Sequence, residues 1–112
     1  MDDGYLYLLR HNHWSMLQIG ITNEPKVRLK SHAQLGWEFM EIRGPMDGYL
    51  TRDWETSILR MLKNSGALIA EANIAGRFDG YTEAWLEETF PISSIRELMQ
   101  LVEDFEEEAG DE

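Results

Sequence analysis

Residues 4–34, GYLYLLRHNHWSMLQIGITNEPKVRLKSHAQ, decide the fold. Residues 4–10 alternate and are rich in Tyr and Leu, which predicts a strand. A turn is expected at 11–13, because Asn tolerates tight backbone conformations, and residues 16–22 are expected to form a second strand. Pro25 suits the first turn of a helix over the rest of this stretch. The stretch therefore predicts a β-hairpin followed by a helix.

The next part of the chain predicts another strand and another helix. Residues 37–43 alternate Trp, Phe and Ile, which is typical of a strand. Turns are expected at 44–45 and 47–48, where Gly stands beside Pro or Asp. Thr51 is then placed to cap a helix that ends near residue 64.

The last third of the chain contains weaker signals. Residues 67–75 are apolar enough for a short helix or a buried strand, and the pattern does not distinguish the two. A short strand is expected at 83–85, and Ser94 begins a capping box before an amphipathic helix. We expect an α/β fold, with a small three-stranded antiparallel sheet flanked by helices. Residues 1–92 would form the main domain, and residues 93–112 a C-terminal helix and acidic tail packed on the same domain.

Composition indicates one folded domain. The chain has 112 residues, of which 43% are hydrophobic, and this is enough for a core. It contains no cysteine, which excludes a disulfide framework and a thiolate metal site. The start is acidic without an apolar run behind it, and no stretch approaches the ~20 apolar residues of a membrane span. We therefore expect a cytoplasmic protein without a membrane partner.

The net charge of −11 is unevenly distributed. Residues 1–63 contain eight basic and eight acidic residues, so the whole negative charge belongs to residues 64–112. The neutral part contains a basic cluster, which comprises Arg10, Lys26, Arg28, Lys30 and His32. This cluster predicts a local positive site, although long-range attraction to DNA should be weak. The alternative is an acidic, solubilising surface with no role in binding nucleic acid.

Two helices carry candidate site residues. Arg28 and His32 lie one helical turn apart, and the planar guanidinium of an arginine suits a phosphate. The alternative is a solvated arginine beside a surface histidine. Helical geometry places Glu55 between Leu59 and Leu62, away from the polar side of its helix. Burying this carboxylate requires a cation, either a divalent metal or an arginine, unless the side chain reaches water.

The first strand presents two tyrosines on one face. Tyr5 and Tyr7 are two residues apart, so both point to the same side of the sheet. A tyrosine close to a reacting water can transfer a proton or orient the water. The alternative is that both rings simply pack. Trp54 and Trp85 are expected to belong to the core rather than to a platform for stacking bases.

Two strings in the hairpin, Tyr5-Leu6-Tyr7 and Gln18-Ile19-Gly20, are followed by the helix that carries Arg28. This ordered set resembles the opening of a GIY-YIG nuclease domain, and the resemblance covers roughly residues 4–90. It implies a hairpin, a helix with an arginine, and a later glutamate that holds a metal ion. Gln18 stands where the second motif has its tyrosine. Glutamine forms hydrogen bonds but cannot act as a base.

The string Gly80-Tyr81-Thr82-Glu83-Ala84-Trp85 resembles the closing motif of the phage-type branch of this superfamily. The resemblance implies that Glu83 or Tyr81 completes the pocket. It also implies a metal-dependent endonuclease that cleaves DNA with Mg²⁺ or Mn²⁺ held by Glu55. The implied catalytic residues are Tyr7, Arg28, His32 and Glu55. The implied substrate-binding residues are Tyr5, Gln18, Arg10, Lys26, Lys30 and Glu83.

Two other functions are compatible with the sequence. The domain would be a nucleic-acid-binding module if its pocket had lost catalysis, as Gln18 hints. It would be an acidic interaction domain if its negative half bound a protein. The amphipathic C-terminal helix offers a surface for a homodimer or for a partner protein, although packing on its own domain is the simpler expectation.

Overall fold

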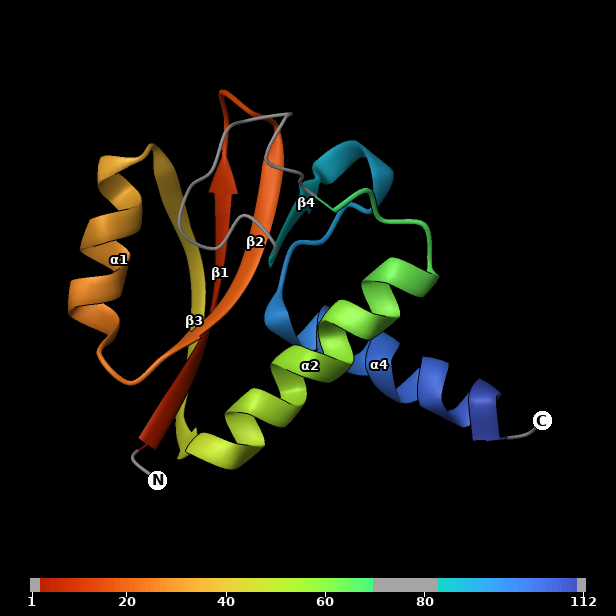
Figure 1. Ribbon diagram of the computed structural model, residues 1–112. Helices are drawn as coiled ribbons and strands as arrows, with labels where there is room; N and C mark the ends of the chain where they lie inside the picture. Colours follow the sequence, from red (N-terminus) through yellow and green to blue (C-terminus); the bar gives the residue numbers. More distant parts are fainter. Residues whose placement is uncertain (1–2, 70–82, 111–112) are drawn as a thin grey trace.

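The computed structural model describes residues 3–69 and 83–110, and it begins with the predicted hairpin (Figure 1). β1 (Asp3–His11) and β2 (Met16–Thr22) pair in antiparallel fashion, with Tyr7 directly opposite Gly20. The strand–turn–strand pattern of the sequence is therefore confirmed. The predicted helix follows as α1 (Pro25–Gln34).

The sheet has four strands among the described residues, and the expected number of three is wrong. β3 (Trp37–Asp47) pairs with the free side of β1. β4 (Ala84–Leu86) pairs with the first half of β2, so the order is β3-β1-β2-β4 and every pairing is antiparallel. A strand of three residues is too short for alternation to show whether it joins a sheet, which explains the error.

The turn expected at 44–45 is also wrong, because β3 continues through it. The pairing of β1 with β3 shifts register between the pairs Gly4–Met46 and Leu6–Arg43, so Gly44 and Pro45 form an irregularity within the strand. Gly44 has a φ of 144°, which glycine adopts more readily than other residues. The glycine and proline therefore bend the strand without ending it.

Asp47, and not Thr51, caps the second long helix, α2 (Gly48–Asn64). The Asp47 carboxylate accepts hydrogen bonds from the backbone N–H groups of Tyr49 and Leu50. The predicted cap at Thr51 is wrong, because this residue lies inside the helix. Its hydroxyl donates to the backbone carbonyl of Asp47. An aspartate at the helix start satisfies two N–H groups that would otherwise lack partners.

The C-terminal helix, α4 (Ile95–Gly110), begins with the predicted capping box. The Ser94 hydroxyl accepts from the N–H of Glu97 at 3.1 Å. The Glu97 carboxylate accepts from the N–H of Ser93, one residue earlier than the usual geometry. A further carboxylate, Glu41 of β3, accepts from the N–H of Ile95 at 2.9 Å and ties the helix start to the sheet.

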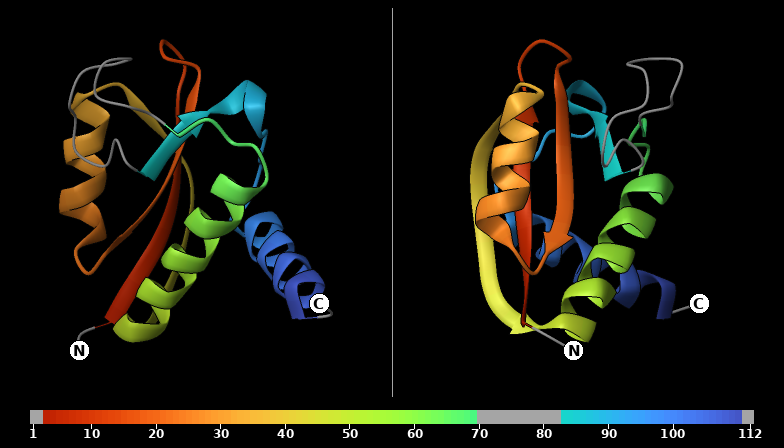
Figure 2. Two further views of the ribbon diagram at one scale, coloured as in Figure 1. Left: turned by 45° about the vertical axis from the view of Figure 1, so that its right-hand side comes forward. Right: turned by 60° about the vertical axis from the view of Figure 1, so that its left-hand side comes forward.

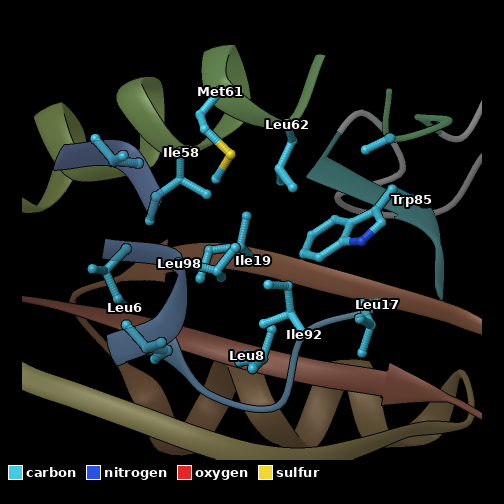
Figure 3. Packing of buried hydrophobic residues seen from close by; sticks show 13 residues of the cluster. Leu6, Leu8, Leu17, Ile19, Ile58, Met61, Leu62, Trp85, Ile92 and Leu98 are labelled. Carbon is cyan, nitrogen blue, oxygen red and sulfur yellow. The ribbon is translucent and has the colours of Figure 1, made fainter. Parts of the chain in front are cut away.

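Helices cover both faces of the sheet (Figure 2). α1 packs on one face, and α2 and α4 pack together on the other. The larger core lies under α2 and α4, where side chains from β1, β2 and β4 meet both helices (Figure 3). Its fully buried members include Leu6, Leu8, Leu17, Ile19, Ile58, Met61, Leu62, Trp85, Ile95 and Leu98.

A smaller apolar cluster lies on the α1 side of the sheet. It consists of Tyr7, Leu9, Met16, Trp37 and Ala84. Leu29 of α1 packs against it. Because strand residues alternate between faces, Leu6 and Leu8 enter the large core while Tyr7 points toward α1. No described helix is both long enough and apolar enough to cross a bilayer.

Because α4 packs into the core, truncating the fully buried side chain of Leu98 should strongly destabilise the protein. Leu98→Ala should lower the free energy of unfolding by about 2–4 kcal/mol, because it removes buried methyl groups and leaves a cavity. Urea denaturation followed by circular dichroism measures this change. The control, Glu103→Ala at an exposed position of the same helix, should change stability by less than about 0.5 kcal/mol. Equal stability of both variants would show that α4 does not belong to the core.

Candidate functional site

Tyr7 and His32 form a buried pair between the sheet and α1. The Tyr7 hydroxyl and His32 Nε2 are 3.1 Å apart, and each side chain is only 1% exposed. Arg28, one turn earlier on α1, is exposed. The two helical positions therefore differ: the imidazole is buried against the tyrosine, while the Arg28 side chain is exposed. A surface position for His32, the alternative considered above, is wrong.

Gly20 determines where the Tyr7 ring lies. A Cβ atom at position 20 would overlap Cζ and the hydroxyl oxygen of Tyr7. The ring thus crosses β2 over the one residue of that strand that has no side chain. Among the described strands, β4 pairs with β2 only as far as Gln18, so this crossing lies beyond the paired part of the β2 edge. The Tyr7 hydroxyl therefore lies over β2 at Gly20, beyond the three β2 residues that pair with β4.

Two carboxyl groups, Glu55 of α2 and Glu83 just before β4, influence each other's ionisation. Burial raises the pKa of Glu55 to about 7 from 4.5, helped by the negative charge of Glu83 and by a hydrogen bond between the two carboxyls. Burial also raises the pKa of Glu83. Oε2 of Glu55 is buried and finds no hydrogen-bond donor among the described residues. At neutral pH this pair therefore requires a shared proton or an added cation.

Each carboxyl group also interacts with one arginine. The charge of Arg28 lowers the pKa of Glu83, and the charge of Arg52 lowers that of Glu55. No ion pair within 4.0 Å joins these groups among the described residues, where the single ion pair is Arg10–Glu87 at 2.9 Å. The alternative in which an arginine, either Arg28 or Arg10, neutralises Glu55 by direct pairing is therefore wrong for the described residues.

These electrostatic interactions connect the two helices that lie on opposite faces of the sheet. Arg28 stands on α1, Glu55 stands on α2, and Glu83 interacts with both. His32 lies one turn from Arg28 on α1 and binds Tyr7. Of the four residues expected to be catalytic, Tyr7 therefore pairs with His32, while Glu55 interacts with Glu83, whose ionisation Arg28 also influences.

Gln18 is fully buried, and within the described ranges, 3–69 and 83–110, neither its Oε1 nor its Nε2 has a hydrogen-bond partner. It pairs with Leu9 of β1 on one side and with Ala84 of β4 on the other. Ala84 directly follows Glu83 in the sequence. Gln18 and Gly20 share a face of β2 because they are two residues apart. An unsatisfied buried amide costs about 1–3 kcal/mol, so its retention at this place indicates a partner such as water or a substrate.

The other predicted binding residues lie apart from this group or at its margin. Tyr5 is half-buried at the β3 irregularity, and Lys26 and Lys30 are exposed on α1. Arg10 is engaged by Glu87. Tyr81 lies outside the described residues.

Trp85 is fully buried and its indole N–H donates to the Phe90 carbonyl at 2.8 Å, which confirms its place in the core.

The sequence interpretation missed Arg52. The residue is exposed, and it lies three positions before Glu55 on α2, which places the two side chains on neighbouring turns. This spacing was the available signal, but the residue resembled an ordinary member of the polar side of the helix. Its effect on the pKa of Glu55 reveals the proximity.

The carboxyl pair fits a hard divalent cation that keeps part of its water shell. The described residues contain no group of three or more His, Cys, Asp or Glu side chains arranged around a metal position. Mg²⁺, however, is commonly bound by one or two carboxylates, with water and substrate phosphate as the other ligands. The buried Oε2 of Glu55, to which no described residue donates a hydrogen bond, is the atom best suited to such an ion.

Comparison of the chain with models of protein families, with curated proteins and with solved structures finds no match. The function of this protein is therefore inferred from the residues of this site.

The raised pKa of Glu55 predicts that the metal-free protein loses stability as the pH rises. Between the unfolded value of 4.5 and the folded value of about 7, the folded state holds more protons than the unfolded state. The free energy of unfolding therefore falls through this window. Solvent screening of this half-buried group limits the loss to about 1–2 kcal/mol.

Urea denaturation in EDTA at about pH 5 and about pH 8 measures this loss. Glu55→Gln should remove most of it, because the amide does not titrate. The matched control, Asp53→Asn, makes the same chemical change at an exposed position of α2 and should preserve the loss. An identical pH dependence in wild type and Glu55→Gln would contradict the assignment.

Proposed function

We propose that this protein is a divalent-metal-dependent endonuclease of the GIY-YIG type, and that it cleaves phosphodiester bonds in DNA. The observation that supports this most strongly is the carboxyl pair Glu55–Glu83, in which the charge of Arg28 acts on Glu83 and a buried oxygen of Glu55 has no donor among the described residues. A phosphodiester-cleaving site needs positive charge and a polarising group at one phosphate. Arg28 and a cation on the two carboxylates would meet that need.

Arg28 would bind the scissile phosphate. Its side chain is exposed and forms no ion pair within 4.0 Å among the described residues, so the donors of its guanidinium are available to a ligand. A guanidinium binds two phosphate oxygens at once and so fixes the orientation of the phosphate. The same contact would stabilise the negative charge that develops on these oxygens during the reaction.

Tyr7 and His32 would control the attacking water and its proton. The Tyr7 hydroxyl accepts or donates one hydrogen bond, and His32 Nε2 lies 3.1 Å from it. The imidazole can take the hydroxyl proton while the hydroxyl oxygen takes a proton from water, so that the proton moves from water to Tyr7 to His32. Burial of both rings keeps bulk water away from this path.

Glu55, with Glu83 beside it, would hold Mg²⁺ or Mn²⁺. When bound, the ion would supply Lewis-acid catalysis and a template for the phosphate. Gln18 would contribute a hydrogen bond to water or to a phosphate oxygen through its amide, which has no partner in the part of the chain that the structure describes. Because an amide does not accept a proton at neutral pH, proton transfer would depend on Tyr7 and His32.

A nuclease assay with Mg²⁺ or Mn²⁺ tests the proposal. Wild type should cleave DNA, and Glu55→Gln should lose about 100- to 1,000-fold in kcat, because one amide replaces the charged ligand. The control variant Asp53→Asn, at an exposed position of the same helix, should cleave within about twofold of wild type.

Equal cleavage by wild type and Glu55→Gln would exclude Glu55 as the metal ligand. Retention of DNA without cleavage by either protein would favour the alternative function, a nucleic-acid-binding module. Failure to bind or cleave DNA even at low salt would overturn both.

A further inference from the structure

We propose that a cavity at the base of the hairpin binds the phosphate that adjoins the scissile one in the substrate strand, and that Arg52 is its main ligand. This inference rests on the proposed function and adds a second phosphate position to the same site. The cavity has a volume of about 290 Å³, near the lower end of the range for ligand pockets. This volume suits a phosphate with part of its sugar.

The cavity is formed where four segments meet. Arg28 enters from α1, Arg52 and Thr51 from α2, Thr22 from the end of β2, and Asp3 from the start of β1. Gly4 of β1 also lines it and allows the close approach of α2, since a Cβ at this position would lie 2.5 Å from the Thr51 hydroxyl oxygen. The cavity therefore depends on the hairpin and both helices together.

The charges lining the cavity favour an anion. Two guanidinium groups and one carboxylate face it, in a protein with a net charge of −11. Neither Arg28 nor Arg52 forms an ion pair within 4.0 Å among the described residues. The Thr22 hydroxyl accepts from the N–H of Glu24 and keeps its own proton for donation. A phosphate would find charge and a neutral donor in one place.

The positions of Arg52 and Glu55 on α2 support a phosphate next to the scissile one. The two residues are three positions apart, which corresponds to a rise of about 4.5 Å along the helix axis. Successive phosphates of one nucleic-acid strand are joined through a single sugar, so two neighbouring phosphates contact protein groups that lie close together. A strand whose scissile phosphate lies between Arg28 and Glu55 would therefore bring the adjoining phosphate near Arg52.

Arg52 also influences the ionisation of Glu55, so binding must be separated from catalysis. The measurement therefore uses Glu55→Gln as the parent protein, in which that carboxyl no longer titrates. Fluorescence anisotropy with a labelled single-stranded or duplex DNA oligonucleotide, at several salt concentrations, gives the Kd and its salt dependence. Arg52→Gln in this parent should raise Kd about 5- to 20-fold and reduce the slope of log K against log salt by about 1.

Arg60→Gln in the same parent is the matched control. Arg60 is exposed on α2 and does not line the cavity, so its loss removes the same charge from the same helix. It should change Kd by less than about twofold. Equal losses in the two variants would overturn the inference, and so would an unchanged Kd in Arg52→Gln. Matching thermal unfolding curves exclude misfolding as the cause.

A second measurement tests which phosphate is bound. A methylphosphonate at the position next to the cleaved bond removes one negative charge from the DNA. It should weaken binding to the parent but not further weaken binding to Arg52→Gln, while an additive effect would overturn the assignment. Absence of cleavage by wild type, with Arg52→Gln still selectively weakened, would reject the proposed enzyme and keep the anion site. Cleavage by wild type together with unaltered binding by Arg52→Gln would support the proposed enzyme and reject the anion site.

Discussion

Burial and the negative charge of Glu83 oppose the ionisation of Glu55, and the rest of the site is arranged around this repulsion. Burial also raises the pKa of Glu83, whereas the hydrogen bond with Glu55 lowers it. Arg28 and Arg52 counteract these increases in pKa from a distance without forming close ion pairs with described residues. A divalent cation would relieve the repulsion more completely than either arginine, and this is the physical basis of the proposed enzyme.

The fold creates this arrangement through the hairpin. α1 and α2 lie on opposite faces of the sheet (Figure 2), and Arg28 of α1 and Arg52 of α2 line the same cavity at the base of the hairpin. Gly20 lets the Tyr7 ring cross β2, and the ring reaches His32 on α1. The large core under α2 and α4 holds the helix that carries Glu55 against the same hairpin. Stability and the proposed function therefore depend on the same strands.

Much of the fold could be predicted because local signals were strong. The alternation in β1 and β2 and the capping box before α4 depend on near neighbours in sequence. The short strand expected at 83–85 is present as β4, but its place in the sheet could not be predicted, because three residues carry no period and the pairing with β2 is nonlocal. The extent of β3 was misjudged because Gly44 and Pro45, which usually form a turn, here produce an irregularity within the strand.

Local spacing along the sequence also predicted part of the site. The spacing of Arg28 and His32 was clear, but whether either was buried depended on the sheet beneath α1. The proximity of Arg52 to the site depends on packing between α2 and the hairpin, which no sequence pattern records.

The most direct test of the account is anomalous diffraction from crystals of the full chain soaked in Mn²⁺. The account predicts an anomalous peak within bonding distance of the Glu55 carboxylate, about 2.0–2.2 Å, with Glu83 beside it or joined through water. Absence of a peak there at saturating Mn²⁺, with the Glu55 and Glu83 carboxyls still hydrogen-bonded to each other, would contradict it.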